Sequence, residues 1–165
     1  MKKVVLLLVL AGLAWWYFDG SRRIDDEAVR NHYKDMLAMY DENNADALCA
    51  QMGSEYRVVD VSFGPEGTRR QEHDRDSACR EVRRALKTIA GLGNISGGLL
   101  TPDFDVEIKN ITISDDHKLA TVESVSTMRM GDAVLVRSRA TDRLVRRVGR
   151  VRSLGGESKT WVYGN

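Results

Sequence analysis

The sequence predicts an α+β domain, with three helices packed on an antiparallel sheet, behind a short apolar segment at the N-terminus. Three observations carry this prediction. Residues 4–18 contain no charged side chain. Residues 25–90 repeat apolar side chains at helical spacing on either side of a short extended stretch, and residues 104–163 alternate apolar and polar side chains as strands do. The chain therefore divides into a segment of residues 1–20 and a domain of residues 21–165.

The apolar segment runs from Val4 to Phe18 and follows Lys2 and Lys3. A secretory signal has the same basic start and apolar core, but it also needs small residues before the cut. The one such site, Gly12-Leu13-Ala14, would release fourteen residues and leave four aromatic residues at the new terminus. Because Trp and Tyr are typical of the membrane interface, we expect an uncleaved anchor, with a cleaved signal as the alternative.

The anchor is short, and its flanks do not fix its orientation. Fifteen residues of helix span about 22 Å, against a bilayer core of about 30 Å, so lysine snorkelling and local thinning would be needed. The three positive charges of Lys2, Lys3 and the free amine are balanced by those of Arg22, Arg23 and Arg30. A long domain crosses largely regardless of charge. We therefore expect a single-pass protein of a bacterial inner membrane, held through Val4 to Phe18, with its domain on the periplasmic side.

Three stretches of the domain carry helical periodicity. The first begins at a cap on Asp25 or Asp26 and ends near Asn43, and the second runs from Ala45 to Met52. The third begins at Asp76 or Ser77 and ends at the glycines at positions 91 and 93, with a loop continuing through 97–98. These are the three helices of the predicted domain.

The remaining stretches read as strands. Residues 56–63 and 68–73 form a predicted hairpin around the turn at 64–67. From Phe104 the apolar side chains alternate, and their phase slips near Lys109 and Asn110, which predicts a bulge. Two long strands follow at about 119–130 and 133–148, and a last hairpin at Gly149 leads to a closing strand at 158–163.

Composition and cysteine usage limit the classes of function. The net charge of +1 hides an asymmetry, because residues 25–60 carry nine acidic against three basic side chains and residues 129–165 carry the reverse. The two cysteines, Cys49 and Cys79, predict one disulfide if the domain is exported, and two buried thiols otherwise. The three histidines are scattered without ligand spacing to either cysteine, so we expect no metal and no cofactor.

The order of elements resembles the nuclear transport factor 2-like family, also called SnoaL-like or ketosteroid-isomerase-like. The resemblance covers about residues 25–163 and rests on that order together with the helix-to-helix junction at 41–48, DENNADAL. It implies a cone-shaped fold, with a curved sheet wrapped around the helices and a pocket between them. It does not imply a reaction, because fold does not fix function.

Enzymes of this family use a carboxylate base in the cone, with a tyrosine and a second acid as donors to the oxyanion. The nearest catalytic candidates here are Tyr33, Asp60 and Asp142. Alternation with Tyr56 and Val58 would place Asp60 on the inner face of its strand. The alternative is that Asp60 faces solvent and that Tyr33 belongs to the core.

Four arginines share one parity on the strand at 133–148, namely Arg137, Arg139, Arg143 and Arg147. The apolar side chains have the other parity, so the arginines should face solvent. Such a row can bind lipid headgroups, an acidic glycan or the acidic surface of a protein partner or second copy, although a plain solvated face needs no partner. Nucleic acid is not expected, because no aromatic side chains lie among these arginines.

These observations favour a membrane-anchored periplasmic domain for protein assembly or ligand recognition, without catalysis. An anchor followed by one such cone is similar in architecture to the inner-membrane assembly subunit of type IV secretion systems. The alternatives are a small-molecule isomerase or cyclase that uses the cone pocket, and a binder of a small ligand or lipid. Whether Asp60 or Asp142 lies in an apolar pocket near Tyr33 or Tyr56 discriminates among them.

Overall fold

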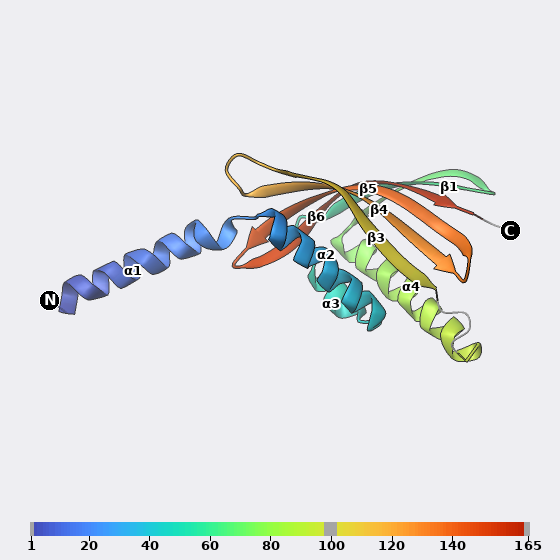
Figure 1. Ribbon diagram of the computed structural model, residues 1–165, viewed down its shortest axis with the longest axis horizontal. Helices are drawn as coiled ribbons and strands as arrows, with labels where there is room; N and C mark the ends of the chain where they lie inside the picture. Colours follow the sequence, from blue (N-terminus) through green and yellow to red (C-terminus); the bar gives the residue numbers. More distant parts are fainter. Residues whose placement is uncertain (1, 98–101, 164–165) are drawn as a thin grey trace.

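The computed structural model describes residues 2–97 and 102–163, in which it places four α-helices, one 3-10 helix and one sheet of six strands (Figure 1). The helices are α1 (Lys2–Phe18), η1 (Gly20–Arg22), α2 (Asp26–Asp41), α3 (Ala45–Ala50) and α4 (Arg75–Ile95). The strands are β1 (Arg57–Gly64), β2 (Gly67–Asp74), β3 (Asp103–Ile113), β4 (Leu119–Met130), β5 (Ala133–Arg147) and β6 (Arg150–Val162). The predicted three helices are α2, α3 and α4, and α1 is the additional one.

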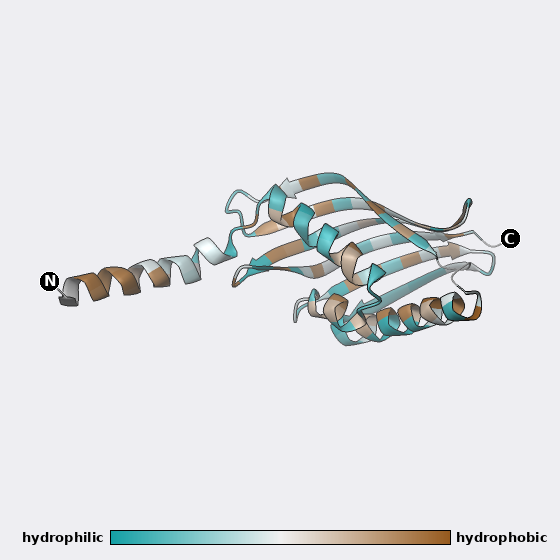
Figure 2. Ribbon diagram, turned by 60° about the horizontal axis from the view of Figure 1, so that its bottom comes forward, coloured by the Kyte–Doolittle hydropathy of each residue, from teal (hydrophilic) through white to brown (hydrophobic). Residues whose placement is uncertain are grey.

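Helix α1 projects away from the domain (Figure 2). Its apolar side chains are exposed. Leu8, for example, is 69% exposed and Trp15 is 64% exposed. Among the described residues, no helix has both the length and the apolarity needed to cross a membrane.

Two turns of the sheet hold the short link between α1 and α2. The amide of Gly149, in the β5–β6 turn, donates to the carbonyl of Ser21 at 3.0 Å. The amide of Ile24 donates to the carbonyl of His117, in the β3–β4 turn, at 2.7 Å. The Ile24 side chain is fully buried in the core. The base of α1 is therefore fixed against one end of the sheet, the end toward which both turns point in Figure 1.

The helices begin where the sequence supplies caps. Asp25 accepts a hydrogen bond from the amide of Ala28 and starts α2, and Asn44 does the same for α3 through Ala47. Helix α4 starts slightly before the predicted position because Asp74 is its cap. It also continues past Gly91 and Gly93 to Ile95, so the prediction that these glycines end it was wrong. Glycine weakens a helix interior by about 1 kcal/mol without forbidding it.

The sheet has the strand order β2-β1-β6-β5-β4-β3, and it is mixed where the sequence predicted an antiparallel sheet. Strands β1 and β6 run parallel, with Val59 beside Glu157 and Phe63 beside Trp161, and every other pair is antiparallel. Hairpins make neighbouring strands antiparallel, but no hairpin joins β1 to β6. Local sequence therefore contains no signal for the direction of that pair.

Irregularities bend three of the long strands. The predicted bulge in β3 is confirmed, because its register against β4 shifts between Ile108 and Asn110. Strand β6 begins at Arg150 rather than near position 158, and its register against β5 shifts between Arg143 and Leu144. The additional length of β6 brings its first half into the core next to α2.

The core lies between α2 and the inner face of the sheet. Its largest fully buried side chains are Ile24, Val29, Val122 and Leu144. Val106, Ile108 and Ile111 of β3 pack around them. Helices α3 and α4 pack against each other beside α2 (Figures 1 and 2). This arrangement leaves a hollow between α2 and the part of the sheet away from α1.

Candidate functional site

A cavity of about 190 Å³ lies between α2 and the inner face of the sheet. Helix α2 contributes Tyr33 and Met36, and Tyr56 comes from the residue just before β1. The sheet contributes Phe104 and Val106 from β3 and Asp142 from β5. The walls are therefore mainly apolar, and they include two acidic residues, Asp142 and the exposed Glu157 of β6.

Asp142 is the less exposed of these two acidic residues, and it lies on the same face of β5 as buried Leu144. Burial raises the pKa of its carboxyl group to about 6, although a hydrogen bond from Ser153 acts in the opposite direction. The Ser153 hydroxyl donates to Asp142 Oδ1 at 2.8 Å, and it accepts from the amide of Gly155 at 2.9 Å. One carboxylate oxygen is thus oriented by a fixed donor.

Two tyrosines face this carboxyl group. Burial raises the pKa of Tyr56 to about 12, and the negative charge of Asp142 adds to that effect. The pKa of Tyr33 is raised for the same two reasons, in the same order, while a hydrogen bond with Ser124 partly opposes them. Both phenols therefore stay protonated at neutral pH and can donate hydrogen bonds.

Asp60 lies on the inner face of β1, as alternation with Val58 predicted, but the structure does not bring it into the cavity with Asp142. Its Oδ1 accepts hydrogen bonds from Ser158 and from Thr160, the latter at 2.9 Å. Both hydroxyls belong to β6, so Asp60 connects the two parallel strands. Of the three catalytic candidates, the cavity therefore contains Tyr33 and Asp142.

The four predicted arginines of β5 are exposed on the outer face, yet they do not form one continuous row. Arg139 lies over the ring of Trp161 at 5.9 Å, and Trp161 stacks on Phe63 at 5.7 Å. Arg137 and Arg139 border a shallow hollow that also contains Glu123 and Glu157. Arg147 is 3.0 Å from Glu55, at the other end of the strand. Binding of an acidic protein, or of a second copy, to this mixed face stays a prediction.

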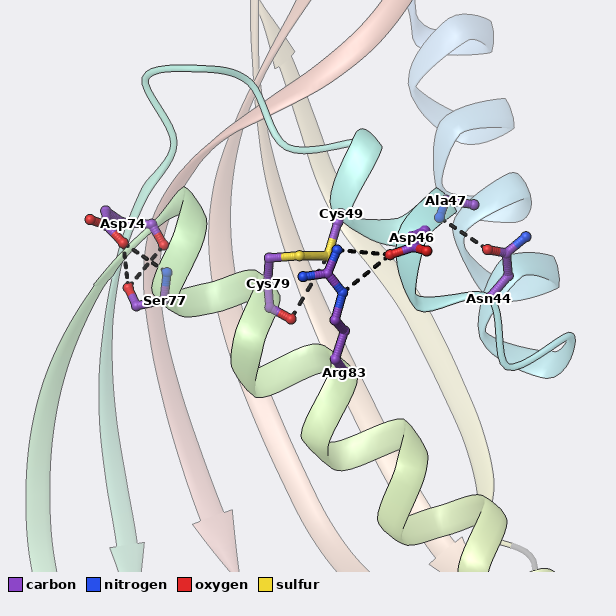
Figure 3. The surroundings of a disulfide bond; sticks show 8 residues. All are labelled: Asn44, Asp46, Ala47, Cys49, Asp74, Ser77, Cys79 and Arg83. Carbon is purple, nitrogen blue, oxygen red and sulfur yellow. Dashed lines mark hydrogen bonds and ion pairs between the residues drawn. A yellow bond between two sulfur atoms is a disulfide. The ribbon is translucent and has the colours of Figure 1, made fainter.

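The predicted disulfide is present and joins α3 to α4 (Figure 3). The Cα atoms of Cys49 and Cys79 are 5.3 Å apart, within the range of natural disulfides. Arg83 of α4 pairs with Asp46 of α3 at 2.8 Å beside it. Among the described residues, no three His, Cys, Asp or Glu side chains converge as metal ligands do.

Sequence reasoning missed the hydroxyl groups that orient the acids. Ser153 and Ser158 lie on either side of Gly155 and Gly156. The alternation of inward and outward side chains along β6 is interrupted next to these glycines. The sequence pattern alone therefore does not show which side chains of β6 face inward. A glycine pair inside an extended segment is the signal that could have indicated a bulge at this point.

Comparisons with known proteins show the class of the fold. No family model matches the chain, and no curated protein matches its sequence. The chain is similar to the crystal structure of a candidate scytalone dehydratase from Novosphingobium aromaticivorans, with 17% identity and a TM-score of 0.55 over 84% of this chain and 87% of that one. It is also similar to a nuclear transport factor 2-like protein of unknown function from Shewanella oneidensis, with 13% identity and a TM-score of 0.53 over 81% and 97%.

A third similar structure is a domain of unknown function with a cystatin-like fold from Nostoc punctiforme, with 13% identity and a TM-score of 0.56 over 86% of this chain and 78% of that one. At these identities the likenesses show the fold alone. The protein therefore has a nuclear transport factor 2-like α+β fold, in which a curved mixed sheet of six strands packs against the helices.

Proposed function

We propose that this chain is a membrane-tethered domain on the periplasmic side of a bacterial inner membrane, and that it binds a small ligand in the cavity without catalysing a reaction. The observation that carries the proposal is that Asp142 lines a mostly apolar hollow together with Tyr33 and Tyr56, close enough for its charge to act on both phenols. Buried carboxyl groups cost stability, so a fold that keeps one beside an empty space has a use for it.

The tether is supported by the surface of α1. Its leucine, valine and tryptophan side chains are exposed over most of its length, and soluble proteins rarely expose an apolar patch of that extent. Helix α1 has 17 residues and is therefore about 26 Å long. A bilayer that thins locally accommodates such a helix. The disulfide is consistent with an oxidising compartment.

The cavity defines the class of ligand. Its volume of about 190 Å³ is below the roughly 300 Å³ at which sites for drug-sized molecules begin. Aromatic and aliphatic walls favour an apolar ring or short chain, and ionised Asp142 favours one hydrogen-bond donor on it. We therefore propose a small, mostly apolar molecule that carries one hydroxyl or amine.

Phenol is a suitable probe, because it has one ring and one donor. We expect it to bind full-length protein with one-to-one stoichiometry at pH 7.5, measured by calorimetry. Asp142→Ala should weaken binding at least tenfold, since a hydrogen bond to a charged group is worth about 1.5–3 kcal/mol. Val106→Trp should abolish binding by filling the cavity.

Arg137→Gln is the matched control, because Arg137 is exposed on the outer face of the same strand and does not line the cavity. It should bind phenol as the parent does. Absence of saturable binding by the parent, or equal binding by the parent and both cavity variants, would contradict the proposed ligand site.

A proton-transfer enzyme is the second candidate, and the raised pKa of Asp142 is the observation that favours it. A carboxyl group with a pKa of about 6 can both accept and return a proton near neutral pH. Phenols kept protonated nearby can stabilise a developing oxyanion. Deuterium exchange next to the carbonyl of cyclohexanone tests this directly. Exchange that depends on Asp142, and is lost in Asp142→Asn, would favour catalysis over simple binding.

A further inference from the structure

The turn between β5 and β6 breaks a local rule of sequence. It has two central residues, Val148 and Gly149, with φ of 51° and 76°, between the paired residues Arg147 and Arg150. Such a type I′ turn strongly favours Asn-Gly or Gly-Gly, because both central residues need positive φ. A β-branched residue there is strained. Val148 is also 58% exposed, so its side chain gains little from packing.

The position of this turn suggests why an unfavourable residue stands at its tip. The Gly149 amide bonds to Ser21, three residues after the end of α1. Nη1 of Arg146 donates to the carbonyl of Arg23 at 3.3 Å, which holds the turn to the link a second time. In Figure 1 the turn lies at the end of the domain from which α1 projects. A membrane that contains α1 would therefore lie against this turn.

The tip of the turn is flanked by basic side chains, whereas acidic side chains lie toward α2, where Asp25 and Glu27 line the same hollow as Gly149 and Arg150. Arg147 also pairs with Glu55 at 3.0 Å. Arg147 and Arg150 flank the tip and are exposed, and Arg23 is exposed on the adjacent link.

The other turn at this end carries two acidic side chains, Asp115 and Asp116, against one basic side chain, Lys118, and all three are exposed. An anionic surface would thus attract the β5–β6 side of the domain and repel the β3–β4 side. An apolar tip between arginines suits the boundary between phosphate headgroups and acyl chains.

We infer that the β5–β6 turn is a second membrane contact, in which Val148 enters the interface and Arg147 and Arg150 bind anionic phospholipid headgroups. This inference rests on the proposed tether. The contact would set the tilt of the domain and hold the ligand cavity at a constant height above the bilayer. The strained valine is retained for contact with lipid and not for stability.

A fluorescent label at the tip tests the contact. The full-length Val148→Cys variant takes an environment-sensitive dye at one thiol, because Cys49 and Cys79 are bonded to each other. Val134→Cys is the matched control, since Val134 is an exposed valine at the far end of β5. We expect a blue shift and at least a twofold rise in emission for position 148 in vesicles with 30% phosphatidylglycerol. Pure phosphatidylcholine vesicles, and position 134 in either lipid, should give no change.

Two further variants separate the roles of charge and strain. Adding Arg147→Gln and Arg150→Gln should remove the emission change at position 148, as should 0.5 M salt. Val148→Asn should raise the Tm by about 3 °C, because asparagine tolerates this backbone conformation. A fall in the Tm would overturn the argument from strain.

Vesicle flotation distinguishes failure of this contact from failure of the tether. If the full chain floats with both vesicle compositions while position 148 reports the same environment in each, the contact is refuted and the tether stands. If the chain floats with neither composition, the tether and the contact are both refuted.

Discussion

At the scale of single residues, Asp142 makes one of two opposite contributions to the pH dependence of stability. The other comes from His32, because burial lowers its pKa to about 4 and stability due to His32 therefore rises as the pH rises from about 4 to about 6.5. The pKa of the Asp142 carboxyl group rises from an ordinary value of 3.8 to about 6 on folding, mainly through burial. Between these two values the folded chain holds a proton that the unfolded chain releases. Stability should therefore fall as the pH rises from about 4 to about 6 and stay constant above that, as far as this residue is concerned.

Asp142→Asn removes this dependence while keeping an oxygen that can accept from Ser153. We expect the variant to be more stable than the parent at pH 7.5, by on the order of 3 kcal/mol, because the pKa shift from 3.8 to about 6 corresponds to about 1.4 kcal/mol for each pKa unit. At pH 4 the two should be equally stable. Urea unfolding at four values between pH 4 and 7.5 measures this. Asp60→Asn is the control, because it keeps Asp142 and therefore the pH dependence. If stability depends on pH in Asp142→Asn as it does in the parent, the raised pKa of Asp142 is contradicted.

At the scale of elements, the bend in β6 depends on two glycines. A Cβ on Gly155, whose φ is 76°, would lie 2.0 Å from the carbonyl oxygen of Arg57, and one on Gly156 would lie 1.9 Å from that of Thr141. Because both neighbours are backbone atoms of paired strands, neither can move cheaply. The close approach lets β6 turn its first half toward α2 and place Ser153 beside Asp142.

Gly155→Ala and Gly156→Ala should each destabilise the domain by about 2 kcal/mol or more, through overpacking and, at position 155, backbone strain. Gly91→Ala is the matched control, because Gly91 lies inside α4 with nothing within 4 Å of its added Cβ. That change should stabilise by up to about 1 kcal/mol. Thermal unfolding of the three variants decides the sign in each case. A neutral result at position 156 would be incompatible with the described β5–β6 pairing.

The link between α3 and α4 is covalent, and the ion pair beside it should contribute little. Cys49→Ser combined with Cys79→Ser should lower the stability by about 3–4 kcal/mol, because the bridge closes a loop with a sequence separation of 30 residues. Arg83→Gln should cost less than 1 kcal/mol, because Arg83 and Asp46 are both largely exposed. Unfolding with and without reductant compares the contributions of the disulfide and the ion pair to stability. A larger loss of stability in Arg83→Gln than in the double serine variant would show that the ion pair matters more.

At the scale of the whole molecule, the sequence predicted the order of elements better than the assembly of the sheet. Alternation along β5 was sufficient to place Leu144 inside and Arg143 outside, because a strand with one buried face repeats every two residues. The parallel pairing of β1 with β6 could not be predicted, since it joins segments about a hundred positions apart without a hairpin. The site shows the same division. Asp142 was identifiable from its residue type, whereas Ser153 reaches it only because β6 bends at Gly155.

The placement of the whole domain relative to the membrane can be tested through its two cysteines. If the domain lies on the periplasmic side, Cys49 and Cys79 should be bridged in cells, because disulfides persist in oxidising compartments. Maleimide should then label the denatured protein only after reduction, and membranes should retain the protein during alkaline washing. Cys49→Ser is the control, since it leaves Cys79 free to react without reductant. Labelling of both cysteines before reduction would instead place the domain in a reducing compartment.

The anchor itself can be tested with two charges in the middle of α1. Leu7→Arg with Leu10→Arg should release the chain from the membrane fraction, because each charge in the middle of the segment costs about 3 kcal/mol of insertion.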